Sequence, residues 1–151
     1  MEHLSENKKN GFTLLEVILS LTFLSVLLLL TVPLSFKLYD SIQQQYFFKE
    51  FEQDVLWLQK RSITEQDIDY LTIDVAKHRY YISDTASSGL KKSKSFPPSW
   101  KVDLRTFQNP LYFSFLGQNR FPGTFELTTT LGTYKFIFPL GKGRLHIEKT
   151  S

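Results

Sequence analysis

The sequence predicts an α+β protein, with one long N-terminal helix followed by an antiparallel β-sheet domain. An apolar run opens the chain, an apolar helical period follows it, and from Asp69 onward the period becomes the two-residue alternation of strands. The chain has 151 residues and no cysteine, which excludes a disulfide framework, a thiolate metal site and a cysteine nucleophile. Because the apolar helical period continues beyond the N-terminal run, we expect the second half of the helix to pack on the sheet.

Residues 12–36 form the first part of this helix and are almost free of charge. Glu16 is the one charged residue among these 25, and residues 17–36 are all uncharged. As a helix, 25 residues extend about 37 Å, against a hydrocarbon core of about 30 Å. We therefore expect a single membrane span with some tilt, rather than a buried core helix.

A secretory signal peptide is the alternative for this segment, and the sequence disfavours it. Signal peptides have an apolar region of about 7–15 residues and then small residues at a cleavage site. Here the apolar run is longer and leads directly into Lys37 and Asp40. Lys8 and Lys9 precede the span, which favours a cytoplasmic N-terminus. The expected location is the cell membrane, with the residues from Lys37 onward outside.

Glu16 lies one turn into the expected membrane helix, where a carboxylate is costly. A charge near the bilayer centre costs roughly 2.5–3.5 kcal/mol on insertion scales, and less near an interface. Two interpretations stay open, hydration near the headgroups or a partner for the charge within a membrane or an assembly. We favour a partner, because ionisable residues inside membranes usually serve a function.

Beyond Pro33 the helical period continues to about Ser62. Apolar residues recur at spacings of three and four on one stripe, which consists of Phe48, Phe51, Val55 and Leu58. We expect one helix over residues 13–62, with residues 37–66 as its continuation outside the membrane. Pro33 removes a backbone hydrogen bond and clashes with the carbonyl of residue 29, so a kink is expected there.

The remaining residues, 67–151, are expected to form the antiparallel β domain. Residues 70–75 and 78–83 alternate as a hairpin would, and residues 84–95 are expected to form a polar, flexible loop. Between the later segments lie Pro- and Gly-containing turn sequences. The further strands are predicted at residues 100–106, 111–116, 124–130, 134–138 and 144–148.

The junction ahead of the apolar run carries the most specific signal in the chain. Residues 8–16 read Lys-Lys-Asn-Gly-Phe-Thr-Leu-Leu-Glu, which resembles the leader junction of type IV pilins and pseudopilins. In that family a membrane peptidase cuts after the glycine, and the new N-terminus is methylated. The resemblance implies that residues 1–11 are a cytoplasmic leader cut between Gly11 and Phe12, that Phe12 is methylated, and that Glu16 serves assembly. Pro33 also matches a proline frequent in the family.

Each of these features has a physical reason. Gly11 has no Cβ, so its backbone can enter a protease cleft that excludes larger residues. The freed amine of Phe12 is a cation, which can neutralise Glu16 of a neighbouring subunit inside an apolar fibre core and fix the axial register. Residues 12–36 are therefore expected to be both the transmembrane helix and the assembly helix.

The C-terminal half narrows the resemblance. It is similar to the H-type minor pseudopilins of type II secretion and to the ComGD-type minor pseudopilins of Gram-positive competence systems. Thirteen lysines against five arginines, and the absence of cysteine, favour the competence type. Apart from residues 96–98, residues 63–110 match no pattern of the family. The segments that carry the similarity are residues 96–98, 115–117, 122–127 and 141–147.

The resemblance implies a pilin-like fold and a minor pseudopilin of a competence pseudopilus, which helps bring external DNA to the uptake machinery. The expected partners are other major and minor pseudopilins, the prepilin peptidase, an assembly platform membrane protein with its ATPase, and membrane lipid. No cofactor or metal is implied, and no enzyme motif is found. A minor pseudopilin of type II secretion and a minor type IV pilin stay open, as does a membrane-anchored DNA-binding receptor. After assembly the protein is expected at the cell surface.

One group of residues is a candidate for weak DNA contact. Cations beside an aromatic ring suit phosphate contact and base stacking. From Lys37 onward, however, 16 Lys and Arg face 12 Asp and Glu, so any contact is expected to be salt-sensitive and independent of sequence. The residues are Lys91, Lys92 and Lys94, expected in the flexible loop, followed by Trp100, Lys101 and Arg105.

Three other patterns are interpreted as structural. His78 and His146 lie in expected strands. The acidic residues 65, 67 and 69 fit a polar helix end better than a calcium loop, because the sharp-turn Gly and the bidentate Glu of such a loop are missing. Residues 141–144, Gly-Lys-Gly-Arg, precede a strand and are expected to form a tight hairpin turn.

Overall fold

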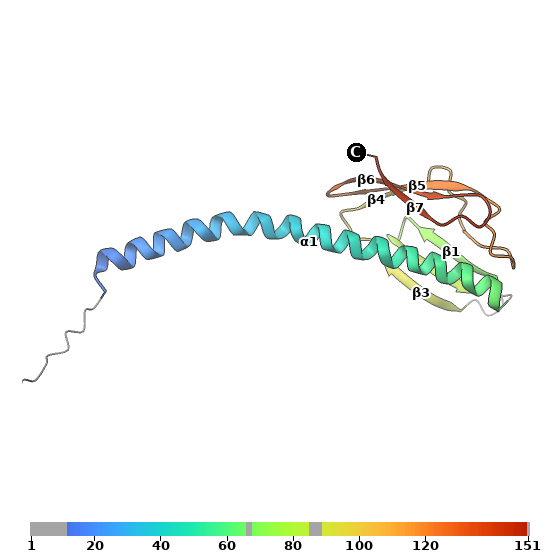
Figure 1. Cartoon of the computed structure of the whole chain (residues 1–151), viewed down its shortest axis with the longest axis horizontal. Helices are drawn as coiled ribbons and strands as arrows, with labels where there is room; N and C mark the ends of the chain where they lie inside the picture. Colours follow the sequence, from blue (N-terminus) through green and yellow to red (C-terminus); the bar gives the residue numbers. More distant parts are fainter. Residues whose placement is uncertain (1–11, 66–67, 85–88, 151) are drawn as a thin grey trace, which may run out of the picture. The chain divides into compact units, whose positions relative to one another are not determined.

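The structure, a computed structural model, describes residues 12–65, 68–84 and 89–150, without the side chains of residues 30–36. Within these ranges one helix precedes seven strands (Figure 1). The chain divides into two compact units, Met1–Tyr39 and Asp40–Ser151. The predicted α+β class with a long N-terminal helix is confirmed.

Helix α1 (Leu14–Thr64) has 51 residues, close to the predicted bounds. Thr13 caps it, because the Thr13 hydroxyl oxygen accepts a hydrogen bond of 3.3 Å from the backbone N–H of Glu16. No glycine occurs between its ends, and Arg61 in the last turn suits the negative end of the helix dipole. The predicted kink at Pro33 concerns a side chain outside the described ones and stays a prediction.

In the first unit the described side chains of α1 are exposed and mostly apolar. Phe12 is 80% exposed, Leu14 79% and Phe23 67%. The hydroxyls of Ser20, Thr22 and Ser25 donate hydrogen bonds to carbonyls of the preceding turn, so they are satisfied within the helix. Among the described residues, no helix combines the length and the apolarity that a membrane crossing needs. The span expected over residues 12–36 stays a prediction.

The first sheet contains three antiparallel strands in the order β1-β2-β3. The predicted hairpin is present as β1 (Asp69–Asp74) and β2 (Arg79–Asp84), with exposed His78 in the turn rather than in a strand. The loop predicted over residues 84–95 is wrong, because β3 (Leu90–Ser95) pairs with β2. The sequence of β3, LKKSKS, has one apolar residue, so it gave no hydrophobic alternation.

The second sheet has four antiparallel strands in the order β4-β5-β6-β7. They are β4 (Lys101–Asp103), β5 (Gly123–Thr129), β6 (Gly132–Phe138) and β7 (His146–Lys149). The single expected sheet is therefore two sheets. Residues 141–144 lie in the connection between β6 and β7, but this connection covers residues 139–145 and is longer than the expected tight hairpin turn.

The strand predicted over residues 111–116 is wrong. Only Leu111 makes an isolated bridge, to Leu71 of β1. The Asn109 side chain accepts a hydrogen bond of 3.0 Å from the Ile73 N–H and donates one of 2.8 Å to the Ile73 carbonyl, so it holds this loop against β1. Leu111 and Phe113 are buried, so the apolar pattern that predicted a strand instead seats a loop in the core.

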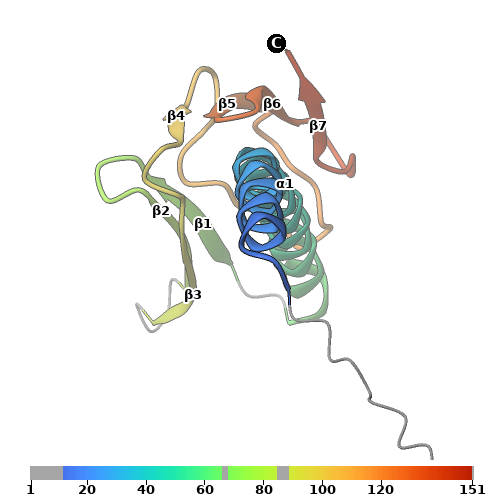
Figure 2. The same ribbon diagram turned by 90° about the vertical axis from the view of Figure 1, so that its left-hand side faces the viewer.

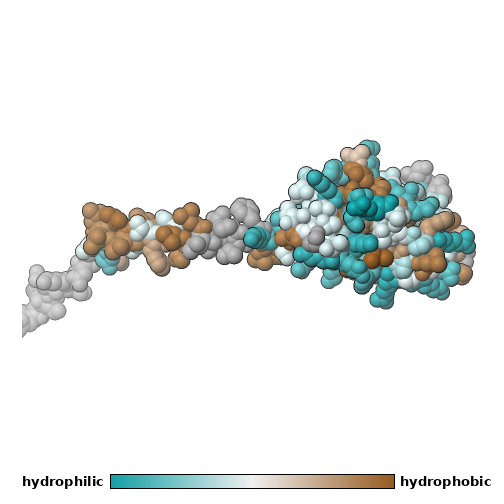
Figure 3. Space-filling model, turned by 90° about the horizontal axis from the view of Figure 1, so that it is seen from above, coloured by the Kyte–Doolittle hydropathy of each residue, from teal (hydrophilic) through white to brown (hydrophobic). Residues whose placement is uncertain are grey.

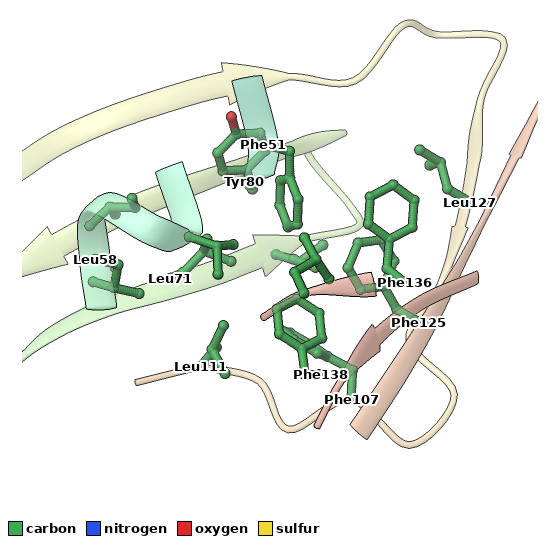
Figure 4. Close-up of a cluster of buried hydrophobic side chains, with 14 of the residues drawn as sticks. Phe51, Leu58, Leu71, Tyr80, Phe107, Leu111, Phe125, Leu127, Phe136 and Phe138 are labelled. Carbon is green, nitrogen blue, oxygen red and sulfur yellow. The ribbon is translucent and has the colours of Figure 1, made fainter. Parts of the chain in front are cut away.

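The second half of α1 lies in the angle between the two sheets (Figure 2). Its side chains meet those of both sheets in one aromatic-rich core (Figure 4). Phe51 is fully buried, and the rings of Phe125 and Phe136 stack with centroids 4.5 Å apart. The predicted helix stripe is correct at Phe51, Val55 and Leu58 but shifted at its start, where Phe47 is buried and Phe48 half-buried.

We predict that Phe51→Ala lowers the free energy of unfolding by about 3–5 kcal/mol, because it leaves a cavity where three elements meet. Tyr46→Ala on the same helix should cost less than about 1 kcal/mol, since such surface changes are mild and Tyr46 is 69% exposed. Urea unfolding of the full chain in detergent micelles, followed by the fluorescence of Trp57 and Trp100, measures both. Equal losses for the two variants would contradict the described core.

Candidate functional site

The first turn of α1 holds Glu16, the predicted assembly residue, three positions after the helix cap Thr13. Thr13 and Glu16 have the spacing of a capping box, in which the residue three positions after the cap is acidic. The Glu16 side chain is exposed, and within the described residues its carboxylate forms no ion pair. It is therefore available to a cation from another molecule. Gly11 lies outside the described residues, and Phe12 begins them.

The lysines predicted to contact DNA are not in a flexible loop. All three lie on β3 and each forms an ion pair, which corrects the expectation of a free basic loop. Lys92 also lies 4.7 Å from the Trp57 ring centroid. The pairs are Lys91 with Asp69 at 2.7 Å, Lys92 with Asp54, and Lys94 with Glu50 at 2.7 Å.

The pairs of Lys92 and Lys94 attach β3 to α1, whereas the pair of Lys91 links β3 to Asp69 of β1. Glu50 and Asp54 are one helical turn apart, and Lys92 and Lys94 are two residues apart on a strand, so each set faces one way. The spacing of the two carboxylates on the helix matches the spacing of the two lysines on the strand. Ion pairs therefore hold β3, which has no apolar face, against α1. Because the lysines stabilise the fold in this way, their charges are partly neutralised.

Asp54 also accepts a hydrogen bond of 2.9 Å from the hydroxyl of Tyr80. Burial, and then the negative charge of Asp54, raise the pKa of Tyr80 well above its usual range. Tyr80 therefore stays protonated and keeps donating. Asp54 is 7% exposed, and its two carboxylate oxygens are both used, one by Tyr80 and one by Lys92.

Asp69 is not a polar helix end, as the sequence suggested, but a buried acceptor. It is 2% exposed and accepts hydrogen bonds of 2.7 Å from both Arg61 Nε and Lys91 Nζ. Desolvation lowers the pKa of Lys91, but the hydrogen bond and the charge of Asp69 outweigh it, so the net pKa is raised. In the described ranges no three acidic or histidine side chains gather as a metal site would need.

The other three residues predicted to contact DNA lie in three different environments. Trp100 is 3% exposed and packs against Phe47 with ring centroids 5.1 Å apart, so its ring cannot stack on a base. Arg105 pairs with Glu126 at 2.8 Å, and that hydrogen bond raises the pKa of Arg105. Lys101 is exposed and forms no ion pair with a described residue. DNA contact by this group stays a prediction, now without base stacking.

Sequence reasoning missed the polar contacts between α1 and the β5–β6 turn. Thr129 Oγ1 lies 2.7 Å from Gln44 Oε1 and donates to it, and both residues are buried. Thr130 donates to Asp40 at 2.9 Å. Gln44 lies three residues before Phe47 and seven before Phe51, so helical spacing alone could have placed it on the buried face.

Known proteins resemble this chain in sequence and in fold, although no protein-family model matches it. It is 23% identical over 143 residues to "Competence protein ComGD" of Bacillus subtilis (strain 168), covering 95% of this chain and 96% of that protein.

Two solved structures share the fold. The minor pseudopilin EpsH of the type 2 secretion system of Vibrio cholerae matches with a TM-score of 0.55 and 18% identity, over 70% of this chain and 95% of that one. The type IV minor pilin FimU of Pseudomonas aeruginosa matches with a TM-score of 0.55 and 13% identity, over 69% and 87%. Both are described as minor subunits, one a pseudopilin and one a type IV pilin, and the shared fold agrees with the pilin-like fold expected for this chain.

We predict that alkaline pH destabilises the domain through Tyr80. Its folded pKa is raised, so the stabilisation is present below the unfolded value of about 10 and is lost as pH rises above it, by at most about 1.4 kcal/mol per pH unit. Urea unfolding at pH 8 and pH 11 should show a larger loss for the wild type than for Tyr80→Phe. Tyr46→Phe, at an exposed tyrosine, should behave as the wild type. Equal pH dependence in the wild type and Tyr80→Phe would contradict the role of burial.

Proposed function

We propose that this type IV pilin-like chain, related in sequence to ComGD, is a minor pseudopilin of a competence pseudopilus that helps bring external DNA to the uptake machinery. The match to ComGD along nearly all of both chains supports the competence assignment. The observation that carries the proposal is the first turn of α1, where an exposed Glu16 without an ion pair among described residues begins an apolar helix.

The proposed mechanism starts with a membrane precursor whose N-terminus is cytoplasmic. The prepilin peptidase cuts between Gly11 and Phe12, and Phe12 is methylated. The new amine then pairs with Glu16 of a neighbouring subunit, since two opposite charges can share an apolar environment that neither tolerates alone. An assembly platform protein and its ATPase move the subunit from the lipid into the fibre, which places the β domain at the cell surface.

Two alternatives within the family draw support from the structural matches. EpsH belongs to a secretion system and FimU is a minor pilin, and both match with the same TM-score. A run of small pseudopilin genes beside an ATPase gene, without an outer-membrane secretin, would favour competence over both. The DNA-receptor alternative has less support, because the β3 lysines on which it rested are ion-paired.

Processing is the first prediction for this function. In cells with the peptidase, mass spectrometry should find a mature chain that begins at methylated Phe12. Gly11→Val should leave the chain uncut because a branched side chain blocks entry of the backbone, and Asn10→Ala should be cut normally. A wild-type chain that keeps residues 1–11 in such cells would contradict the proposal.

Assembly through Glu16 is the second prediction. Glu16→Val should be processed and stay in the membrane but fail to enter the pseudopilus. Removing one member of a buried pair costs about 3–5 kcal/mol, which lowers incorporation by about two to four decades. Ser20→Val is the matched control, because the Ser20 hydroxyl bonds only within the helix, to the Glu16 carbonyl at 2.8 Å. Co-isolation with the major pseudopilin measures both, and normal incorporation of Glu16→Val would show that the carboxylate is dispensable.

A further inference from the structure

The charges of the β domain are divided unevenly. From residue 104 to residue 147 the chain holds one carboxylate, Glu126, against five Lys and Arg. Glu126 pairs with Arg105 at 2.8 Å, and Lys135 lies opposite Glu126 and Glu148 in the sheet register. The other three cations, Arg120, Lys142 and Arg144, are exposed and form no ion pair with any residue that the structure describes.

These three cations come from two neighbouring loops. Asn119 and Gly141 exchange backbone hydrogen bonds of 2.7 and 2.8 Å, so residues 111–122 and 139–145 lie side by side. Gln59 of α1 donates to the Gly117 carbonyl at 2.7 Å, which anchors the first loop to the end of the helix. Both loops lie at the end of the domain where α1 ends (Figure 1).

Exposed aromatic side chains lie in the same loop as Arg120. Phe115 is 50% exposed and Phe121 39%. Tyr112, Phe115 and Arg120 line one open hollow of about 150 Å³. On the unit Asp40–Ser151, brown apolar patches lie among teal hydrophilic and white atoms (Figure 3). We call Arg120, Lys142 and Arg144, together with Phe115 and Phe121, the distal basic surface.

We propose that the distal basic surface is where this chain contacts DNA, a proposal that rests on the competence function proposed above. The three cations contact phosphates, and Phe115 stacks on an unpaired base. Unlike the lysines of β3, these cations have no carboxylate partner within the described residues that DNA must displace. The aromatic rings beside them supply the stacking surface that buried Trp100 does not.

The test measures binding of fluorescent oligonucleotides to the full chain in neutral-detergent micelles over a range of salt. Replacing Arg120, Lys142 and Arg144 with Gln should weaken binding to single-stranded DNA at least tenfold and reduce the slope of log affinity against log salt by about two to three. Lys49, Lys77 and Lys149, exposed lysines outside both candidate DNA surfaces and replaced together with Gln, remove the same charge elsewhere and should leave both values near wild type. Equal effects of the two triple variants would overturn the proposal.

Phe115→Ala tests the stacking contact. It should lower the affinity for single-stranded DNA about tenfold and leave binding to a duplex of the same length unchanged. Equal losses on single strands and duplexes would overturn the stacking role.

Anionic lipid is the other polyanionic surface that these cations could bind. Vesicles of phosphatidylglycerol, with phosphatidylcholine vesicles as control, test it. Vesicle binding that depends on the three cations, without DNA binding, would overturn the proposal in favour of a lipid contact.

A cellular measurement separates this proposal from the proposed function. The distal triple variant, folded by circular dichroism, should enter the pseudopilus as the wild type does while transformation falls at least tenfold. Failure of this variant alone to enter the fibre would show an assembly contact and overturn the DNA assignment. Failure of the wild type to enter any fibre would overturn the pseudopilin function, and the binding measurements in micelles would still stand independently.

Discussion

The ring of Phe51 contacts both sheets at once, and the β domain depends on this contact. Its centroid lies 5.0 Å from that of Tyr80 in β2 and 5.5 Å from that of Phe136 in β6. No strand ladder joins the two sheets in the described residues. The one isolated bridge of β1 runs from Leu71 to Leu111, in the loop between β4 and β5. The second half of α1 therefore supplies the middle layer of the core, and without it each sheet would expose one apolar face.

The same helix continues into the first unit, where its environment differs. Large apolar side chains such as Leu14 and Phe23 are exposed there, and an exposed apolar surface of this kind marks contact with a membrane or with other proteins. Under the function proposed above, this surface meets both in turn, first lipid and then the helices of other subunits. Glu16 is the one charged residue of residues 12–36, and the proposed pairing with the Phe12 amine of a neighbouring subunit accounts for its place there.

Helical spacing was a reliable guide to this chain, whereas strand alternation and charge were less so. The bounds of α1, the β1–β2 hairpin and the strands β5 and β6 followed from periodicity. Strand β3 was missed because its lysines are satisfied by Glu50, Asp54 and Asp69, and such distant partners leave no trace in local sequence. The loop around Leu111 imitated a strand because its apolar side chains fill the core from an irregular backbone. The burial of Trp100 was not predicted either, because the basic residues near it in the sequence do not show where its ring points.

The central claim is that the exposed first half of α1 is covered by other subunits after processing. A photoactivatable phenylalanine analogue at Phe23, which is 67% exposed, tests it directly. In cells with the prepilin peptidase, illumination should join this chain to other pseudopilins, and in cells without the peptidase these adducts should be missing. The same analogue at Lys77, in the exposed β1–β2 turn, is the control for non-specific capture. Peptidase-positive cells in which Phe23 forms no adduct with a pseudopilin would contradict the account.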